Sequence, residues 1–254
     1  MYPRTLIDEA ALARLYRDGA YTYGDLEPHI RAIYARHIRR AMRSLPTKGE
    51  RRSIDIGCGN GFMLEEMRRL GFEASGIEPS ADAIALADPS VRPHIVQGLA
   101  SPSLLPAERF DLLTCFQTLD HVPDPAAFVA LCLSALRPGG VALFINHDVG
   151  SFTARLLGER CPMIDVEHTF LHTKRTMRLL FERAGFEQVT VFPVANAYPL
   201  RYWLHLLPVS PKARKAALSI AGLLHAQSLV IPLFAGNLGL MARRPLHSSI
   251  TGLD

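Results

Sequence analysis

The stretch 53–61 brings together residue types that bind the polar part of a nucleotide-like ligand. It reads Ser-Ile-Asp-Ile-Gly-Cys-Gly-Asn-Gly, an apolar strand that runs into three glycines at alternate positions, with Asp55 two residues ahead of the first. Glycine permits positive φ and lets a ligand approach the backbone more closely than a Cβ allows. The amides of such a loop, together with the helix N-terminus that follows, attract a polar or anionic group. We therefore expect four loop residues to line a cofactor site: Gly57, Cys58, Gly59 and Gly61.

A second carboxylate, Glu78, follows at a spacing typical of a ribose-binding acid. It stands 23 positions after Asp55, at the carboxyl end of an expected strand. An acidic residue about 20 positions past such a loop is placed to accept hydrogen bonds from both ribose hydroxyls, because a carboxylate accepts at two oxygens and donates nothing. We expect Glu78, with Pro79 beside it, to bind the ribose; the alternative is a surface glutamate before a proline.

Three histidines are candidates for a general base, since imidazole titrates near neutral pH. His147 is the first choice, because it follows an expected strand and either Asp148 or a backbone carbonyl could fix its tautomer. His121, after the preceding strand, is the second choice. His168 is the third, because its segment can fold back over the site. For each of them the alternative is a histidine that caps a helix or fixes a loop, with catalysis resting on alignment alone.

Neither a metal site nor a disulfide framework is indicated. The four cysteines, at 58, 115, 132 and 161, stand singly, without a Cys-x-x-Cys pair. His168 and His172 are four residues apart and on a helix would share one face as metal ligands. They precede Thr173, however, the expected N-cap of the next helix, so that helix has not begun at either histidine. We therefore expect no metal.

The elements that must position these residues alternate between strand and helix from residue 51 onward. Ser80, Asp124 and Thr173 suit N-caps, and Gly71 and Gly185 suit the position just past a helix. Five such alternations predict a doubly wound α/β sheet. Two late strands joined by a long excursion suit an antiparallel hairpin, so we expect seven strands, mostly parallel, with an antiparallel last strand. The expected strands are 53–56, 73–77, 94–97, 110–116, 141–145, 187–194 and 233–242, the expected helices are 62–70, 81–87, 126–136 and 174–184, and Arg-Pro-Gly-Gly at 137–140 is expected to break the chain.

The segments that flank this alternation are expected to cover the site. Residues 1–48 suggest an N-terminal helical lid, with helices over 6–16 and 28–45 and an aromatic turn between them that presents Tyr21 to the cofactor. The alternative is a loop packed on the domain. Residues 49–245 are expected to form the main domain and 246–254 a flexible tail.

An apolar, proline-punctuated excursion occupies 196–232 of the main domain. A bilayer span needs about 20 uninterrupted apolar residues, and polar residues and Pro232 interrupt this stretch. We therefore expect no stable membrane insertion. The excursion is expected to cover the acceptor pocket or a partner in a homodimer, with contact to a membrane surface as the less favoured alternative.

Bulk composition excludes several classes of protein. With 48% hydrophobic and 20% charged residues in 254, the chain has the composition of a globular protein. The net charge is +4, but the basic residues are scattered rather than gathered in the stripe that nucleic-acid binding favours. The N-terminus does not read as a signal peptide, so we expect a cytoplasmic protein that does not bind nucleic acid.

The combination of motifs resembles the class I S-adenosylmethionine-dependent methyltransferases. The glycine loop matches their first motif, and two further segments, 110–125 and Leu-Arg-Pro-Gly-Gly at 136–140, match their fourth and fifth strands in the right order. More weakly, 167–172 and 179–186 are similar to the coenzyme Q O-methyltransferase-like group, which includes bacterial tailoring and cell-envelope enzymes. The resemblance implies a Rossmann-like fold and S-adenosylmethionine as cofactor, with Asp55 orienting the loop and meeting the cofactor's amino group.

Two positions depart from the pattern of that family. Asp120 stands where members commonly have a glutamate, in "Leu-Glu-His-Val-x-Asp-Pro". After the third strand the family often has Gly-Asp-Ala, whose acid meets the adenine, whereas this chain reads Gly-Leu-Ala-Ser at 98–101. The adenine would then be held near Leu99 and Ala100, by Ser101, or by apolar packing. The remaining expected cofactor contacts are Phe116, which could stack on the sulfonium or the adenine, and Gln117.

The function that the resemblance implies is methyl transfer to a small-molecule acceptor, with O-methylation preferred, in bacterial biosynthetic tailoring or in cell-envelope or quinone metabolism. Two rival functions remain. One is methylation of RNA or protein; against it, the chain lacks an Asn/Asp-Pro-Pro-Tyr/Phe segment after the fourth strand and the Pro-Cys nucleophile of cytosine C5 enzymes. The other is a non-catalytic cofactor-binding partner protein, because an intact cofactor site does not prove turnover.

Overall fold

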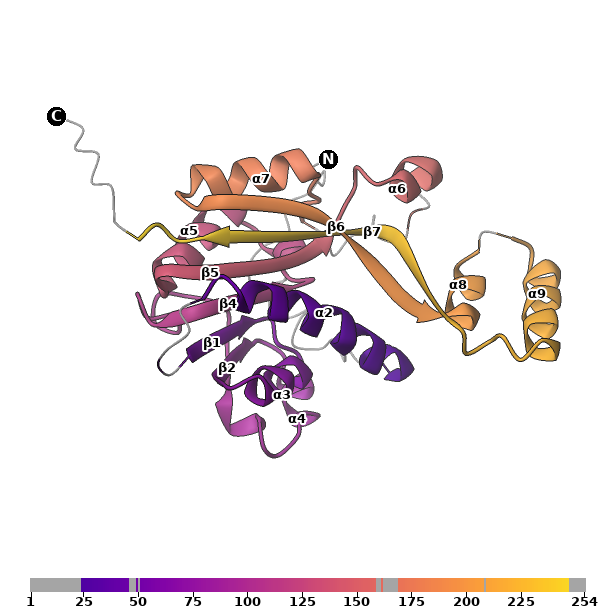
Figure 1. The fold of residues 1–254 in the computed structure, drawn as a ribbon, viewed down its shortest axis with the longest axis horizontal. Coiled ribbons are helices and arrows are strands. Elements are labelled where there is room, and N and C mark those ends of the chain that lie inside the picture. Colours follow the sequence, from indigo (N-terminus) through magenta and orange to yellow (C-terminus); the bar gives the residue numbers. More distant parts are fainter. Residues whose placement is uncertain are drawn as a thin grey trace.

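A seven-stranded sheet organises the computed structural model, which describes residues 24–45, 49, 51–158, 161, 169–207 and 209–246 (Figure 1). The strand order is β3-β2-β1-β4-β5-β7-β6. β7 runs antiparallel to both of its neighbours and the other pairs are parallel, as expected from the sequence. The strands are β1 (Arg51–Ile56), β2 (Phe72–Glu78), β3 (Ile95–Gln97), β4 (Phe110–Phe116), β5 (Leu136–His147), β6 (Glu187–Pro199) and β7 (Val230–Arg243).

Helices cover both faces of this sheet, so the central strands β1, β4 and β5 are buried over most of their length. α2 and α3 pack on one face, with the buried side chains of β4 and β5 that point to that side. α5 and α7 pack on the other face. The described helices are α2 (Glu27–Met42), α3 (Phe62–Arg69), α4 (Ala81–Ala85), α5 (Pro125–Ala135), α6 (Phe152–Leu157), α7 (Lys174–Arg183), α8 (Leu200–Leu206) and α9 (Pro211–Leu223), with short 3-10 turns η1 (Gly24–Leu26), η2 (Arg92–His94) and η3 (Leu119–His121).

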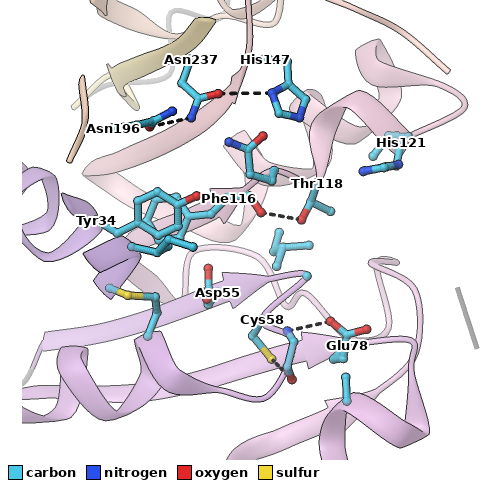
Figure 2. Close-up of a pocket in the computed structure, with 18 of the residues that line it drawn as sticks. Tyr34, Asp55, Cys58, Glu78, Phe116, Thr118, His121, His147, Asn196 and Asn237 are labelled. Carbon is cyan, nitrogen blue, oxygen red and sulfur yellow. Dashed lines mark hydrogen bonds between the residues drawn. The ribbon is translucent and has the colours of Figure 1, made fainter. Parts of the chain in front are cut away.

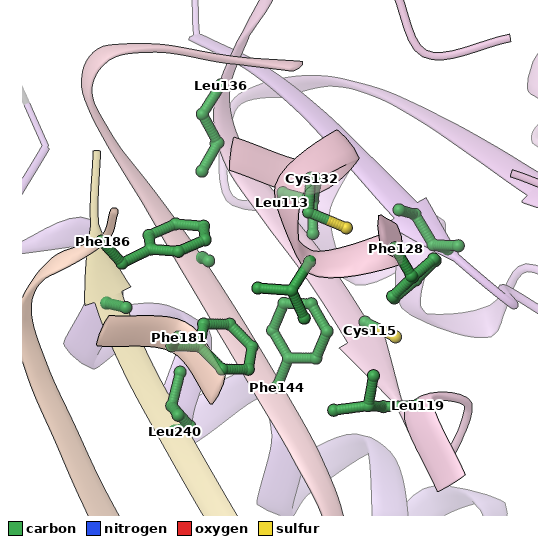
Figure 3. Packing of buried hydrophobic residues seen from close by; sticks show 14 of the residues in the cluster. Leu113, Cys115, Leu119, Phe128, Cys132, Leu136, Phe144, Phe181, Phe186 and Leu240 are labelled. Atoms are coloured by element: carbon green, nitrogen blue, oxygen red, sulfur yellow. The ribbon is translucent and has the colours of Figure 1, made fainter. Parts of the chain in front are cut away.

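Aromatic rings hold α7 on the sheet. Phe144 of β5 meets Phe181 of α7 edge-on with ring centroids 4.8 Å apart, and Phe181 in turn lies 5.2 Å from Phe186 (Figure 3). Phe128 of α5 closes the same cluster against Phe144. Phe144 and Phe181 have no exposed surface, so the end of β5 that reaches the site is held in a close-packed core.

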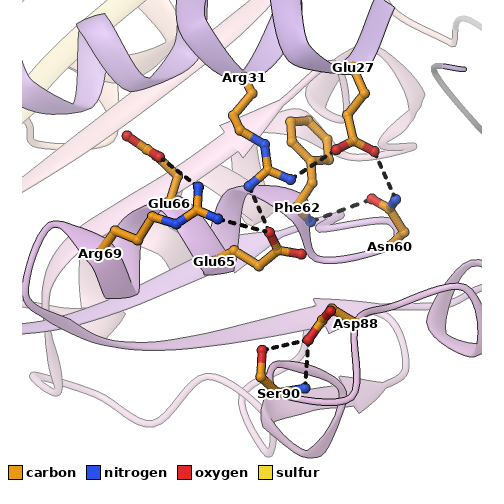
Figure 4. Close-up of polar contacts among 9 residues, drawn as sticks. All are labelled: Glu27, Arg31, Asn60, Phe62, Glu65, Glu66, Arg69, Asp88 and Ser90. Atoms are coloured by element: carbon orange, nitrogen blue, oxygen red, sulfur yellow. Dashed lines mark hydrogen bonds and ion pairs between the residues drawn. The ribbon is translucent and has the colours of Figure 1, made fainter. Parts of the chain in front are cut away.

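Ion pairs fasten α2 over the glycine loop and α3 (Figure 4). Arg31 donates to Glu27 at 2.9 Å and to Glu65 of α3 at 2.8 Å. Glu27 also accepts from the Asn60 side chain at 3.3 Å, and Asn60 lies in the loop itself. The helix expected over 28–45 is present as α2, which ends at Met42, and it is tied directly to the glycine loop.

Several predicted boundaries were wrong. β5 begins at Leu136, and residues 137–140 form an irregularity within the strand rather than a break before it. Both late strands are longer than expected, because β6 reaches Pro199 and β7 begins at Val230. α6 lies in a stretch where the sequence showed no periodicity. The excursion contains two helices, α8 and α9, at the end of the twisted extension of β6 and β7 (Figure 1). Within the described ranges, no helix is long and apolar enough to cross a bilayer.

His37 of α2 gives the fold a pH-dependent stability. Its ring stacks on Phe192 of β6 at 5.1 Å, and its Nε2 is buried without a hydrogen-bond partner. Burial, with the nearby positive charges of Arg36 and Arg40, lowers the pKa of His37 to about 4. Since the unfolded chain takes up a proton below about pH 6.5 and the folded chain only near 4, stability falls as the pH drops through that window.

We expect the variant His37→Leu to have a smaller slope than the parent, with the contribution of the buried His172 retained. Its stability relative to the parent should rise by roughly 1–2 kcal/mol between pH 7.5 and pH 4.5. Urea unfolding at pH 7.5, 6 and 4.5 measures the difference. The same substitution at the exposed His94 is the control and should leave the slope unchanged. A parallel pH dependence in His37→Leu and the parent would contradict the assignment.

Candidate functional site

The glycine loop turns sharply against β2 at the carboxyl edge of the sheet. The N–H groups of Gly57 and Cys58 donate to the Ile77 carbonyl at 2.8 and 3.2 Å. Gly57, Gly59 and Gly61 have φ of 72, 56 and 75°, the left-handed region that glycine adopts at least cost. Gly61 is also the residue from which α3 begins. Gly57, Cys58 and Gly59 line the cavity above the loop, as expected, whereas Gly61 is outside the lining found among the described residues.

Two buried carboxylates stand beside this loop. Glu78 accepts from the Gly59 N–H at 2.8 Å and from the Ser80 N–H at 2.9 Å. Asp55 accepts from the Thr114 hydroxyl at 2.6 Å. Burial raises the pKa of Asp55 to about 7, against the hydrogen bond from Thr114, and burial also raises the pKa of Glu78. Both carboxylates line the cavity and are strong acceptors for hydroxyl or ammonium donors of a ligand.

An aromatic wall rises from the end of β4 over the loop. Phe116 stacks on Tyr34 of α2 with ring centroids 4.4 Å apart. The next residue, Gln117, adopts φ of 54° and has a buried side-chain oxygen without a hydrogen-bond partner. Since a buried polar atom is normally paired, the Gln117 oxygen is an acceptor that a bound ligand can satisfy. All three side chains line the cavity.

The segment after β3 forms the opposite rim. Leu99 and Ala100 line the cavity, as does Pro79 after β2. Ser101 is outside the lining found among the described residues, and its hydroxyl lies 2.9 Å from that of Ser103. Of the adenine contacts suggested by the sequence, the structure therefore leaves the backbone and apolar surface near Leu99 and Ala100.

Two of the three candidate histidines line the same cavity, which has a volume of about 1280 Å³. Figure 2 shows His121 and His147 at one end of it and Asp55, Cys58 and Glu78 at the other. His147 Nδ1 lies 3.2 Å from the side-chain oxygen of Asn237, whose amide nitrogen donates to Asn196 at 3.0 Å.

Asp148 does not fix the tautomer of His147, although one of the alternatives drawn from the sequence expected it to; Asn237 contacts the imidazole instead. The Asp148 carboxylate caps the Gly150 N–H at 2.8 Å, whereas Asn237 meets the imidazole. Because Asn237 gives its amide N–H to Asn196, it turns its oxygen to His147. His147 then donates from Nδ1, which leaves the lone pair on Nε2.

The excursion, expected to cover the acceptor pocket or a dimer partner, lines the far end of the cavity, but sequence reasoning named none of the side chains that do so. The far end is lined by Tyr198, Tyr202 and Trp203, whose rings contact one another at 4.9 to 5.5 Å, and by Leu206 and Phe234. The Trp203 indole donates to the Ile231 carbonyl at 2.9 Å, which fixes it against β7. A cluster of aromatic residues after an expected strand was the only signal in the sequence, and it gives no indication of which way the rings point.

Two predicted site residues, Tyr21 and His168, lie outside the described residues. Among the residues that the structure describes, no group of three or more His, Cys, Asp or Glu side chains is arranged to hold a metal ion. Cys58 is buried at the loop, and burial raises the pKa of its thiol well above the ordinary value. It is therefore a packing residue and not a thiolate nucleophile.

Gly57 cannot carry a side chain in this structure. Its φ is +72°, and an added Cβ would collide with the Thr118 side chain. We expect Gly57→Ala to destabilise the protein by about 2–4 kcal/mol, from backbone strain plus the collision. Gly71→Ala is the matched control, since Gly71 has φ of +88° but open space around a Cβ, and it should cost only the roughly 1–2 kcal/mol of strain. If urea unfolding gave the same loss of stability for Gly57→Ala and Gly71→Ala, the Thr118 side chain would move aside at no cost, and the expected collision would be wrong.

A family model and two curated relatives indicate the same family. A family model described as "Methyltransferase domain" matches residues 27–191. A curated relative named "Ubiquinone biosynthesis O-methyltransferase", from Albidiferax ferrireducens, is 31% identical over 163 residues, which are 59% of this chain and 64% of the relative. A relative of the same name from Paracidovorax citrulli is 32% identical over 166 residues, 60% of this chain and 68% of the relative.

Solved structures share the fold at lower identity. A SAM-dependent methyltransferase from Archaeoglobus fulgidus is similar with a TM-score of 0.56 at 21% identity, covering 84% of this chain and 94% of that one. Phosphoethanolamine N-methyltransferase 2 from Haemonchus contortus, in complex with S-adenosyl-L-methionine, has a TM-score of 0.54 at 17% identity and covers 95% of this chain and 58% of that one.

Proposed function

This chain belongs to the class I S-adenosylmethionine-dependent methyltransferases, and on that premise we propose that it methylates a hydroxyl group of a small, largely apolar acceptor. The cofactor, S-adenosylmethionine, supplies an activated sulfonium methyl group when bound. What the chain's own residues contribute is a place for the cofactor, alignment of the acceptor and a route for the acceptor's proton.

The loop end of the cavity fits this cofactor. Glu78 is a buried carboxylate at the edge of the cavity, as the ribose hydroxyls require, and Asp55 offers a second buried acceptor for an ammonium group. The backbone of Gly59 is open to close approach, since nothing lies within 4 Å of the place where a Cβ would stand. The buried side-chain oxygen of Gln117, which has no partner in the protein, can accept a hydrogen bond from the cofactor. In this proposal Leu99 and Ala100 hold the adenine, and Phe116 covers the sulfonium. The described part of the proposed lid contributes Leu26, Ile30 and Tyr34 to the lining of the cavity, and its residues 1–23 lie outside the described residues.

The observation that carries the acceptor assignment is the chemical contrast between the two ends of the cavity. Past the histidines, the lining consists of aromatic and aliphatic side chains from β6, α8 and β7. Such a surface favours an apolar or aromatic molecule, which it can desolvate. The two curated relatives are named as O-methyltransferases, which supports oxygen as the atom that is methylated. The proposed acceptor is thus a small molecule and not a nucleic acid.

His147 is the proposed general base. The hydrogen bond with Asn237 fixes a tautomer whose Nε2 can take a proton from a hydroxyl. His121, from η3, lines the same end of the cavity and is the second candidate. Alignment of the acceptor by the rings at the far end of the cavity, those of Tyr198, Tyr202 and Trp203, contributes independently of either base.

A cofactor-consumption screen tests the proposal. Phenols, sugars and acyl intermediates, each offered with S-adenosylmethionine, are assayed for S-adenosylhomocysteine release, with Glu78→Ala as the blank. We expect turnover with a hydroxylated aromatic of low polarity and none with sugars. Turnover only with amines or with RNA would overturn the assignment of the acceptor while leaving the family unchanged.

A further inference from the structure

The extension that carries α8 and α9 gathers many exposed apolar side chains. Ten of the seventeen exposed large hydrophobic side chains of the described residues fall between positions 206 and 234. Leu223 and Leu224 at the end of α9 are 80% and 71% exposed, and Phe234 of β7 is 67% exposed. A contiguous apolar surface of this kind on a globular protein marks a site of interaction. We call residues 198–234 the arm.

The side chains of α9 are arranged as in an amphipathic helix that lies on an interface. Arg214, Leu218 and Ala221 turn inward, where the Arg214 guanidinium donates to the Leu207 carbonyl at 3.1 Å and Ala221 is buried. On the outer side, Ala213, Ala216, Ile220, Leu223 and Leu224 follow a helical spacing and form one exposed apolar stripe. Lys212 and Lys215, both exposed, stand beside that stripe. An apolar stripe flanked by lysines is typical of helices that bind the surface of a bilayer.

The charge of this region determines what kind of partner fits. The sequence has no aspartate or glutamate between Glu187 and Asp254. Arg201 at the base of α8 is paired with Asp25 of η1 at 3.2 Å, which leaves Lys212 and Lys215 as the cations beside the stripe. Two copies of the chain joined through their α9 faces would bring like charges together, which disfavours association. The surface of an anionic bilayer offers phosphates to the lysines and acyl chains to the leucines.

We propose that the arm docks the protein reversibly on a membrane surface that contains anionic phospholipid. Leu223, Leu224 and Ile220 enter the boundary between headgroups and acyl chains, and Lys212 and Lys215 lie against the phosphates. The helix lies on the bilayer and does not cross it. The cavity supports this orientation, because Leu206, Leu207, Leu233 and Phe234 both line it and are exposed on the arm. An apolar acceptor, which rests on the proposed function, could pass from the bilayer into the cavity along this surface.

Vesicle flotation tests the proposal. Purified protein is mixed at low salt with vesicles of phosphatidylcholine, either alone or with about 30% phosphatidylglycerol. This fraction places several anionic lipids under each lysine. We expect flotation with the anionic vesicles, weaker flotation with phosphatidylcholine, and release at about 0.5 M salt, because screening shortens the range of the charges. The double variant Leu223→Glu/Leu224→Glu should bind at least tenfold more weakly. Lys212→Glu/Lys215→Glu should also bind at least tenfold more weakly, given about fivefold for each lysine lost.

Matched controls separate docking from general changes of charge or hydrophobicity. Lys174→Glu/Arg175→Glu makes the same change of charge on exposed positions of α7, and Leu86→Glu/Leu179→Glu the same apolar change on the body of the molecule. Both should float as the parent does. Circular dichroism and S-adenosylhomocysteine binding, which involve none of the mutated arm residues, establish that each variant is folded.

Equal flotation of the parent and of Leu223→Glu/Leu224→Glu would overturn the proposal, as would the absence of any binding to anionic vesicles at low salt. A dimer in sedimentation analysis that dissociates in Leu223→Glu/Leu224→Glu, without flotation, would instead assign the face to a second copy of the chain. Flotation does not depend on turnover. The proposed acceptor can therefore be wrong while the arm still binds vesicles, and the arm can fail to bind vesicles while the proposed acceptor is correct.

Discussion

Glu78→Ala is expected to weaken binding of S-adenosylhomocysteine by about 10- to 150-fold, which corresponds to the roughly 1.5–3 kcal/mol of hydrogen bonds to a charged group. The Glu78 carboxylate lies at the cavity, held by the N–H groups of Gly59 and Ser80. Its loss removes the acceptor for the ribose and leaves two loop amides without their partner. Isothermal titration calorimetry measures the change, and a melting curve establishes that the variant is folded at the temperature of the titration.

Glu73→Ala is the control for this experiment. Glu73 belongs to the same strand, but it is exposed and pairs with Arg52 at 2.8 Å, away from the cavity. It should bind S-adenosylhomocysteine as the parent does. If Glu78→Ala kept the parent's affinity, Glu78 would not be part of the cofactor site, and binding of NAD in place of S-adenosylhomocysteine would overturn the whole assignment.

His147→Ala is expected to lower turnover by roughly 10²–10⁴ while cofactor affinity changes little. The imidazole lies at the acceptor end of the cavity, apart from Glu78 and the glycine loop (Figure 2). Removal of a general base therefore affects proton transfer and leaves the cofactor contacts in place. Turnover and S-adenosylhomocysteine binding are measured on the same preparation, with exposed His94→Ala as the control and His121→Ala as the competing assignment.

Asn237→Ala tests whether the tautomer of His147 matters. Without the Asn237 oxygen, Nδ1 loses its partner, so we expect a smaller fall in turnover, together with a displaced pH–rate profile. A purely structural role would lower stability without moving that profile. Should both His147→Ala and His121→Ala turn over normally, catalysis rests on alignment without either histidine, and the acceptor is then an amine, a carbanion or an oxygen that is already ionised.

Local sequence patterns determined much of this fold. β4 spans Phe110–Phe116 as predicted, because a short apolar run bounded by polar residues has one favourable place in a sheet that is covered on both faces. Thr173 and Asp124 cap their helices as predicted, since capping depends on residues only two or three positions away. The glycine loop and Glu78 likewise follow from short-range spacing.

Prolines misled the prediction at the late strands. β6 contains Pro193 and Pro199 and was expected to end at Val194, yet it continues because it lies at the edge of the sheet. An edge strand has a side on which no N–H is needed for pairing. β7 likewise contains Pro232 in the part that pairs with β6 alone. Which strand would lie at an edge depends on the order of the whole sheet.

The acceptor end of the site was decided by tertiary structure. His147 meets Asn237 because β5 and β7 pair antiparallel in a register that sets these two residues opposite each other, although 90 positions separate them in the sequence. Asn196 reaches the same point through the pairing of β6 with β7. Tyr34 joins the cavity because the Arg31–Glu65 ion pair with α3 and a hydrogen bond from Asn60 hold α2 over the glycine loop. The sequence alone determined the cofactor loop, whose residues are neighbours along the chain; the partners of the proposed base come from distant segments, and only strand register and helix packing bring them together.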